Sequence, residues 1–125
     1  MKTKAPIFPL GKLPNDHLQR LLERYVLTDE RVIVGPGIGE DAAVIEAGDR
    51  YLVLKTDPIT FVAEDIGWYV IQINANDLAT RGARPEWFLS TLLLPEGKAS
   101  SQLVEEIFAQ IWQACKSLEI GRAHV

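Results

Sequence analysis

Apolar residues in the first quarter of the chain change from an irregular spacing to a helical one. Residues 1–11 mix prolines and a glycine with isolated apolar positions, which predicts an extended arm because proline interrupts helical hydrogen bonding. Residues 15–25 place apolar side chains three and four positions apart, and Asn15 or Asp16 can cap their N-terminus. This spacing predicts a short surface helix, with its apolar positions at Leu18, Leu21, Leu22 and Tyr25.

Three β-rich runs follow, at residues 31–34, 42–45 and 51–55. A glycine-rich segment separates the first run from the second, and a Gly48–Asp49 turn joins the second to the third. Pro58 prevents the third strand from continuing, because proline has no amide hydrogen for the ladder. The pattern predicts a β-hairpin with one further strand beside it.

The second half of the chain alternates two helical patterns with one apolar run. Residues 65–81 carry apolar side chains near one helical stripe, and Gly82 is placed to end that helix. Residues 86–94 predict a strongly apolar strand. A last helix begins at Ser100 or Ser101 and has a broad apolar face. The elements are thus expected in the order helix, β-hairpin, helix, strand, helix.

Composition narrows the class of protein without changing this outline. The 125 residues are 47% hydrophobic and 24% charged, which is typical of one globular domain. A net charge of −4 disfavours nucleic-acid binding. No apolar run approaches the roughly 20 residues that span a bilayer, and the N-terminus lacks the apolar core of a signal peptide. We therefore expect a cytoplasmic protein, with Cys115 as a small buried apolar residue.

Three aspartates are the candidates for chemistry. Asp41 follows the glycine-rich segment, Asp57 follows the third strand, and Asp77 interrupts an apolar helix. Two adjacent strands bring Asp41 and Asp57 toward one region. Asn74 and Asn76 lie in the same helix, although asparagine and aspartate favour caps and turns over helix interiors. Carboxylate and amide oxygens suit magnesium, which keeps phosphate and water as its other ligands.

Each of these signals also has a structural interpretation. The glycines of residues 35–39 form either a turn or a phosphate cradle, and they match neither the P-loop nor the dinucleotide fingerprint. Asp57 before a proline is a turn former or a ligand. Asp77 is a solvated or capping residue or a ligand. Arg81 and Arg84 either complement the helix dipole or anchor a phosphate or carboxylate.

Three segments, taken in order, resemble one known superfamily. Residues 37–45 read Gly-Ile-Gly-Glu-Asp-Ala-Ala-Val-Ile, residues 55–57 read Lys-Thr-Asp, and residues 74–85 read Asn-Ala-Asn-Asp-Leu-Ala-Thr-Arg-Gly-Ala-Arg-Pro. This succession is similar to aminoimidazole ribonucleotide (AIR) synthase, thiamine-monophosphate kinase, selenophosphate synthetase and the HypE-type hydrogenase maturation proteins. The resemblance covers residues 12–118.

The resemblance implies an ATP-binding N-terminal domain of the α+β class, with a mixed sheet and helices on one face. In such proteins the sheet pairs with its twin in a homodimer to form a shared β-barrel. ATP and Mg²⁺ are the implied cofactors, with no residue assigned a catalytic role. The implied metal ligands are Asp41, Asp57 and Asp77. These three and the following residues are the implied nucleotide-binding set: Gly37, Gly39, Lys55, Thr56 and Asn76.

The helix motif resembles the hydrogenase-maturation and general synthase-related branch of this superfamily. A thiamine-type kinase would more often show Ser-Asp and a methionine before the glycine, where this chain has Thr80 and Arg81. The resemblance implies that ATP phosphorylates and activates an oxygen of an acceptor that the sequence does not identify, with hydrogenase maturation proteins as partners. A small-molecule kinase and a non-catalytic dimeric assembly module are the alternatives.

The end of the chain departs from the family pattern. Residues 120–125 read Ile-Gly-Arg-Ala-His-Val, which ATC GGA AGA GCA CAC GTC encodes, and that string resembles a sequencing adapter. We therefore expect an arm at 1–11, a C-terminally incomplete domain at 12–118 and a non-native tail at 119–125. His124 carries no functional weight, and His17 is interpreted as solvated.

Overall fold

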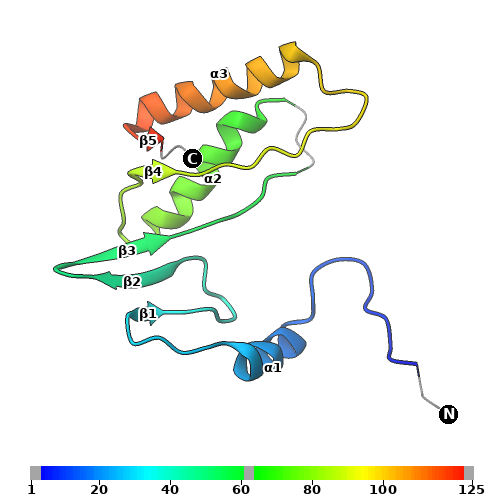
Figure 1. Ribbon diagram of the computed structural model, residues 1–125, viewed down its shortest axis with the longest axis vertical. Helices are drawn as coiled ribbons and strands as arrows, with labels where there is room; N and C mark the ends of the chain where they lie inside the picture. Colours follow the sequence, from blue (N-terminus) through cyan, green and yellow to red (C-terminus); the bar gives the residue numbers. More distant parts are fainter. Residues whose placement is uncertain (1–3, 61–63, 123–125) are drawn as a thin grey trace.

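The computed structural model describes residues 4–60 and 64–122, and Figure 1 shows their arrangement. Two long helices lie side by side at one end, and a small antiparallel sheet and a short helix lie toward the N-terminal arm. Along the chain the elements are α1 (Asn15–Tyr25), β1 (Val32–Val34), β2 (Ala43–Ala47), β3 (Arg50–Leu54), α2 (Ile66–Ala79), β4 (Trp87–Phe88), α3 (Ser101–Leu118) and β5 (Gly121–Arg122).

Helix α1 covers the predicted residues, but a different residue occupies its N-terminal cap position. Neither Asn15 nor Asp16 caps it, because Pro14 holds the cap position and no side chain bonds to the first amides. The carbonyl oxygen of Pro14 accepts the first helical hydrogen bond from the amide of Leu18 at 3.0 Å. Proline presets its own φ at −56°, so the chain turns into the helix without a side-chain cap.

The sheet has the order β1-β2-β3 and is antiparallel throughout. Strands β2 and β3 form the predicted hairpin, in register from Ala43 opposite Leu54 to Ala47 opposite Arg50. Gly48 adopts a positive φ of 70° in the connecting turn, a conformation that glycine reaches without steric cost. The hairpin sets the direction in which the chain leaves β3, toward α2.

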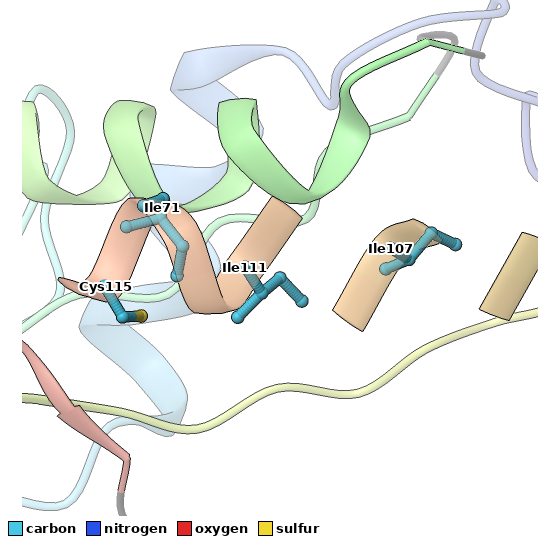
Figure 2. Packing of buried hydrophobic residues seen from close by; sticks show 5 residues of the cluster. Ile71, Ile107, Ile111 and Cys115 are labelled. Carbon is cyan, nitrogen blue, oxygen red and sulfur yellow. The ribbon is translucent and has the colours of Figure 1, made fainter. Parts of the chain in front are cut away.

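The hydrophobic core lies between α2 and α3 (Figure 2). Its buried residues are Ile71, Ile107, Ile111, Ala114 and Cys115. Cys115 is 7% exposed, which confirms it as a small buried apolar residue. The helices approach most closely at Gly67, where a Cβ atom would lie 2.6 Å from the backbone oxygen of Ile107. The Gly67 amide also donates to the side-chain oxygen of Gln110 at 2.9 Å.

The strand predicted over residues 86–94 is mostly absent. Only Trp87 and Phe88 form a strand, β4, which pairs in parallel with the two residues of β5. The remaining apolar residues have no partner strand among the described residues, and Leu93 is 94% exposed. Two separate small sheets, one antiparallel and one parallel, therefore replace the single mixed sheet that we expected.

The helix ends are otherwise close to those predicted. The Ser100 hydroxyl accepts a hydrogen bond from the Leu103 amide at 3.1 Å and caps α3. Gly82, at a φ of 70°, ends the turn that follows α2. Among the helices in the described part of the chain, none has the length and apolar character needed to cross a membrane.

Candidate functional site

Lys55 is the centre of the candidate site. It follows the last residue of β3, and its side chain is only 11% exposed. Its Nζ atom lies 3.1 Å from Oδ2 of Asp77 and 3.9 Å from Oδ2 of Asp57. The two aspartate side chains are 27% and 46% exposed, respectively. The structure thus brings three of the predicted site residues together at the junction of β3 and α2.

Helix periodicity explains why Asp77 reaches this junction. Asn74 and Asp77 are three residues apart, so they share one face of α2. Asn74 donates through Nδ2 to the backbone oxygens of Asp57, at 3.3 Å, and Val70, at 2.8 Å. The first of these bonds ties the helix to the segment after β3. Asn74 was not among the predicted site residues, although its place one turn before Asp77 in an apolar helix was a signal for it.

The oxygen atom of the Asn74 side-chain amide, Oδ1, is buried and accepts no hydrogen bond from the described residues. A buried polar atom without a partner costs about 1–3 kcal/mol. Such atoms are uncommon in folded proteins and cluster where a ligand or water completes the site. The orphaned oxygen lies on the residue that anchors the Asp57 backbone, so it belongs to the same site.

The charges around Lys55 favour its protonated form. Burial alone lowers the pKa of the ammonium, because a buried charge loses hydration. The hydrogen bond and charge of Asp77, with the charges of Asp57 and Asp41, outweigh that loss and leave the pKa of Lys55 raised. All three predicted metal-ligand residues therefore act on this one ammonium group, with Asp41 acting through its charge.

The glycine-rich segment forms a turn that is tied to the end of α2. The carbonyl of Gly37 accepts a hydrogen bond from the amide of Glu40 at 3.3 Å, and Gly39 has a φ of 82°. The carboxylate of Glu40 forms an ion pair with Arg81. Arg81 thereby holds the turn next to the helix that carries Asp77. Of the two interpretations of this segment, the structure shows the turn directly, and phosphate binding remains a prediction.

The remaining predicted residues make no hydrogen bond or ion pair with the Lys55 side chain. Thr56 and Asn76 are exposed, and Asp41 is exposed at the end of the glycine-rich turn. Arg84 is also exposed. Asn76 is not joined to the Lys55 group, whereas Asn74 and Asp77 of the same helix contact Asp57 and Lys55.

The donor set fits a magnesium ion held by few protein ligands. Within residues 4–60 and 64–122, no three His, Cys, Asp or Glu side chains lie close enough together to hold a metal ion. Asp57 and Asp77, however, both place a carboxylate oxygen within 4 Å of one atom, Nζ of Lys55. Magnesium in phosphate-binding sites commonly takes one or two carboxylates and completes its shell with phosphate and water.

A surface hollow lies elsewhere in the described part of the chain. It has a volume of about 530 Å³ and lies at the N-terminal end of α3, beside Val104 and Phe108. None of the residues around Lys55 lines it. The candidate site is therefore defined by the charged groups around Lys55 and not by this hollow.

Comparison with known proteins identifies the family of the chain. The family described as "AIR synthase related protein, N-terminal domain" matches residues 39–122, which include Lys55 and all three aspartates. The match extends past Leu118, where the motifs predicted that the resemblance ends, and the origin of residues 119–125 remains a prediction. No solved structure is significantly similar to the chain.

Several curated proteins are also similar. A protein of Methanocaldococcus jannaschii, named for hydrogenase expression/formation, is 34% identical over 114 residues, which are 83% of this chain and 34% of the relative. Thiamine-monophosphate kinase of Aquifex aeolicus is 32% identical over 87 residues, 63% of this chain and 28% of the relative. Phosphoribosylformylglycinamidine cyclo-ligase of Vigna unguiculata is 29% identical over 92 residues, 66% of this chain and 23% of the relative.

The chain thus spans about a third or less of the length of these relatives. The match of the family over two thirds of the chain, together with the three motifs in order around Lys55, shows that the chain belongs to the AIR synthase-related family and carries sequence of its N-terminal domain.

Proposed function

We propose that this chain is the magnesium-dependent ATP-binding domain of an AIR synthase-related enzyme that uses ATP to phosphorylate and activate an oxygen of its substrate. The observation that carries the proposal is the convergence of Asp57 and Asp77 on one cationic point between β3 and α2. Two carboxylates this close repel each other unless a cation lies near them. A site that binds metal and phosphate likewise needs carboxylates gathered around one cation.

Some residues of the proposed site bind the cation, and others bind the phosphate. Asp57 and Asp77 supply carboxylate oxygens, and Asp41 adds negative charge beside them. Gly37 and Gly39 leave the backbone of the turn open, so its amides can approach a phosphate closely. Bound magnesium supplies charge neutralisation at the phosphate oxygens.

Two exposed polar residues complete the proposed set. Thr56 lies between Lys55 and Asp57, and Asn76 precedes Asp77, so both reach the surface beside the carboxylates. A hydroxyl and an amide at these places can donate hydrogen bonds to phosphate or sugar oxygens. We assign both to nucleotide binding and not to metal binding.

The acceptor is proposed from two kinds of relative. The Methanocaldococcus jannaschii relative covers 83% of this chain and is named for hydrogenase expression/formation, which favours an acceptor in nickel-iron hydrogenase maturation and partners among the maturation proteins. Thiamine-monophosphate kinases match a shorter part, at 32% and 36% identity, and favour a small-molecule kinase as the second candidate. In both, ATP activates or modifies an acceptor oxygen, so both use the same nucleotide site.

Calorimetric titration with a non-hydrolysable ATP analogue and Mg²⁺ tests the nucleotide site. We expect the parent chain to bind the analogue in a magnesium-dependent way. Asp77→Asn should abolish that binding, because it removes the carboxylate charge and keeps the side-chain shape. Asp49→Asn is the matched control, since Asp49 lies in the β2–β3 turn with its side chain 93% exposed.

Each outcome of the titrations of the parent and the two variants has one interpretation. Binding by the parent and by Asp49→Asn, with none by Asp77→Asn, supports the proposed site. Equal binding by all three proteins contradicts the assignment of Asp77. A folded parent that takes up no analogue contradicts the ATP site as a whole and favours a non-catalytic assembly module.

We also propose a homodimer formed through the antiparallel sheet. Leu52 and Leu54 alternate along β3 and so share one face of the sheet, where they are 42% and 49% exposed. Val32 of β1 lies on the same face, because it pairs with Ile45 and Ile45 pairs with Leu52, and it is 38% exposed. Apolar positions on an exposed sheet are typical of a surface that a partner covers.

A further inference from the structure

Lys55 differs from an ordinary surface lysine in the direction of its side chain. Lysine usually keeps its ammonium group in water while its stem lies on the protein. Here the side chain is 11% exposed, although both carboxylates that it meets are more exposed than it is. The ammonium therefore lies inward, between the segment after β3 and the face of α2.

We propose that Lys55 is an internal counter-ion that competes with a divalent cation for the carboxylates of Asp57 and Asp77. The inference rests on the proposed function, because it concerns the same carboxylates. It adds a regulatory residue to the site: cation binding begins with release of the Lys55 ammonium, and the affinity for the cation depends on how firmly that ammonium is held.

Charge and distance make the two cations mutually exclusive. Nζ lies 3.1 Å and 3.9 Å from the two carboxylate oxygens, which is the distance range of a direct ion pair. A divalent cation bound to the same oxygens would lie within a few ångströms of the ammonium and repel it. One of the two cations must leave the space between the carboxylates.

The surroundings allow the lysine to leave without moving the backbone. Asn74 bonds to the backbone oxygen of Asp57 at 3.3 Å and so holds the segment against α2 independently of Lys55. The lysine stem is flexible and carries its charge at one point, unlike the planar fork of arginine. The side chain can therefore rotate toward solvent while Asp57 and Asp77 stay in place.

Direct binding of Mn²⁺ to the full 125-residue chain, measured by loss of the free-ion electron paramagnetic resonance signal, tests the competition. Lys55→Met removes the ammonium and keeps most of the stem. We expect it to bind Mn²⁺ about twofold to fivefold more tightly than the parent, the scale of one lost ion pair. Lys98→Met, at an exposed loop lysine, should bind Mn²⁺ as the parent does.

A second measurement uses the unaltered protein and so does not depend on whether Lys55→Met folds without metal. Acylation of each lysine by a succinimidyl ester, followed by mass spectrometry, reports the exposure of its amine. We expect Mg²⁺ to increase the labelling of Lys55 severalfold and to leave Lys98 unchanged.

The outcomes separate this inference from the proposed function. Tighter Mn²⁺ binding by Lys55→Met, or increased Lys55 labelling with Mg²⁺, supports the counter-ion role. Mn²⁺ binding that is equal or weaker in Lys55→Met, with constant Lys55 labelling, overturns the inference and leaves the metal site intact. Absence of Mn²⁺ binding in both proteins overturns the metal site and the inference together.

Discussion

Asp29 and Arg31 form a close ion pair at the start of β1. The Arg31 guanidinium donates to both carboxylate oxygens of Asp29, at 3.0 Å and 2.7 Å, and the Arg31 amide donates at 2.9 Å. These hydrogen bonds, first that of the side chain and then that of the backbone, lower the pKa of Asp29 from 3.8 to about 2. The pair fixes the turn from which the sheet begins.

This pair makes a pH-dependent prediction. Because the pKa of Asp29 is lower in the folded chain than in the unfolded one, its contribution to stability is present above pH 3.8 and is lost as pH falls through about 2. Carboxyl-detected NMR titration should show a midpoint near 2 in the parent. Arg31→Gln should return that midpoint toward 3.8, whereas Arg50→Gln should not move it. An unchanged midpoint in Arg31→Gln would contradict the assigned cause.

At the scale of residues, the side chains of the candidate site were more predictable from the sequence than the contacts between them. The motifs singled out Asp57 and Asp77, and the structure brings both carboxylates to Lys55. The contact between Lys55 and Asp77 spans 22 positions of sequence and depends on how α2 lies against β3, which no local pattern specifies. The Asn74 bond to the Asp57 backbone depends on the same packing.

At the scale of elements, Gly67 decides how closely α2 and α3 pack. In an open helix, Gly→Ala would stabilise the fold by about 0.5–1 kcal/mol, because glycine costs more backbone entropy. Here the new Cβ would lie 2.6 Å from the Ile107 oxygen and 2.8 Å from the Gln110 Cβ atom. We therefore expect Gly67→Ala to destabilise the chain by about 1–3 kcal/mol, as overpacking does.

Urea unfolding of Gly67→Ala measures this effect. Gly35→Ala is the matched control, because its Cβ would meet only the Val32 side chain, at 3.4 Å, and its backbone is unstrained. A lower free energy of unfolding in Gly67→Ala alone supports the close helix contact. A gain in stability at Gly67 would mean that the helices do not meet there.

The N-terminus of α3 supports a second prediction at this scale. The Ser100 hydroxyl accepts from the Leu103 amide and satisfies one of the free amides of the first turn. Ser100→Ala should lower the free energy of unfolding by about 1 kcal/mol. Ser101→Ala, one position inside the helix, should have little effect, so equal losses at both serines would contradict the cap.

Element limits were predictable where a local residue sets them and not where a partner does. Ser100 begins α3 through its side chain, and Gly82 ends the turn after α2 through its backbone conformation. Both were predicted. Pro14 displaced the expected caps Asn15 and Asp16 because its fixed φ already sets the turn. The run 86–94 has the composition of a strand, but only two of its residues find a partner, in β5.

At the scale of the whole molecule, the chain exposes far more surface than its mass requires. Its accessible surface is 10741 Å², against roughly 6,700 Å² for a compact monomer of 13.9 kDa. Large apolar side chains contribute to the excess, among them Leu52 and Leu54 on the sheet and Trp112 on α3. The α+β fold class was predictable from the resemblance of the three motifs, whereas no local pattern specifies how much apolar surface stays exposed.

The proposed homodimer gives a prediction at the same scale. Light scattering coupled to gel filtration should give the parent twice the mass of one chain. Leu52→Glu combined with Leu54→Glu should give a monomer, because it places charges on the sheet face. Trp112→Gln should stay dimeric, since Trp112 lies on α3 and is 61% exposed there. A monomeric parent contradicts the homodimer, and a monomeric Trp112→Gln moves the interface away from the sheet.

The ion pair of Glu40 and Arg81 makes the glycine-rich turn sensitive to ionic strength. Both side chains are about one-third exposed, at 37% and 33%, so dissolved salt screens their attraction. The screening distance falls from about 10 Å at 0.1 M salt to about 3 Å at 1 M. Salt therefore loosens the turn from α2 while it also weakens the attraction of any phosphate. Affinities of this chain for anions are comparable only at one fixed salt concentration.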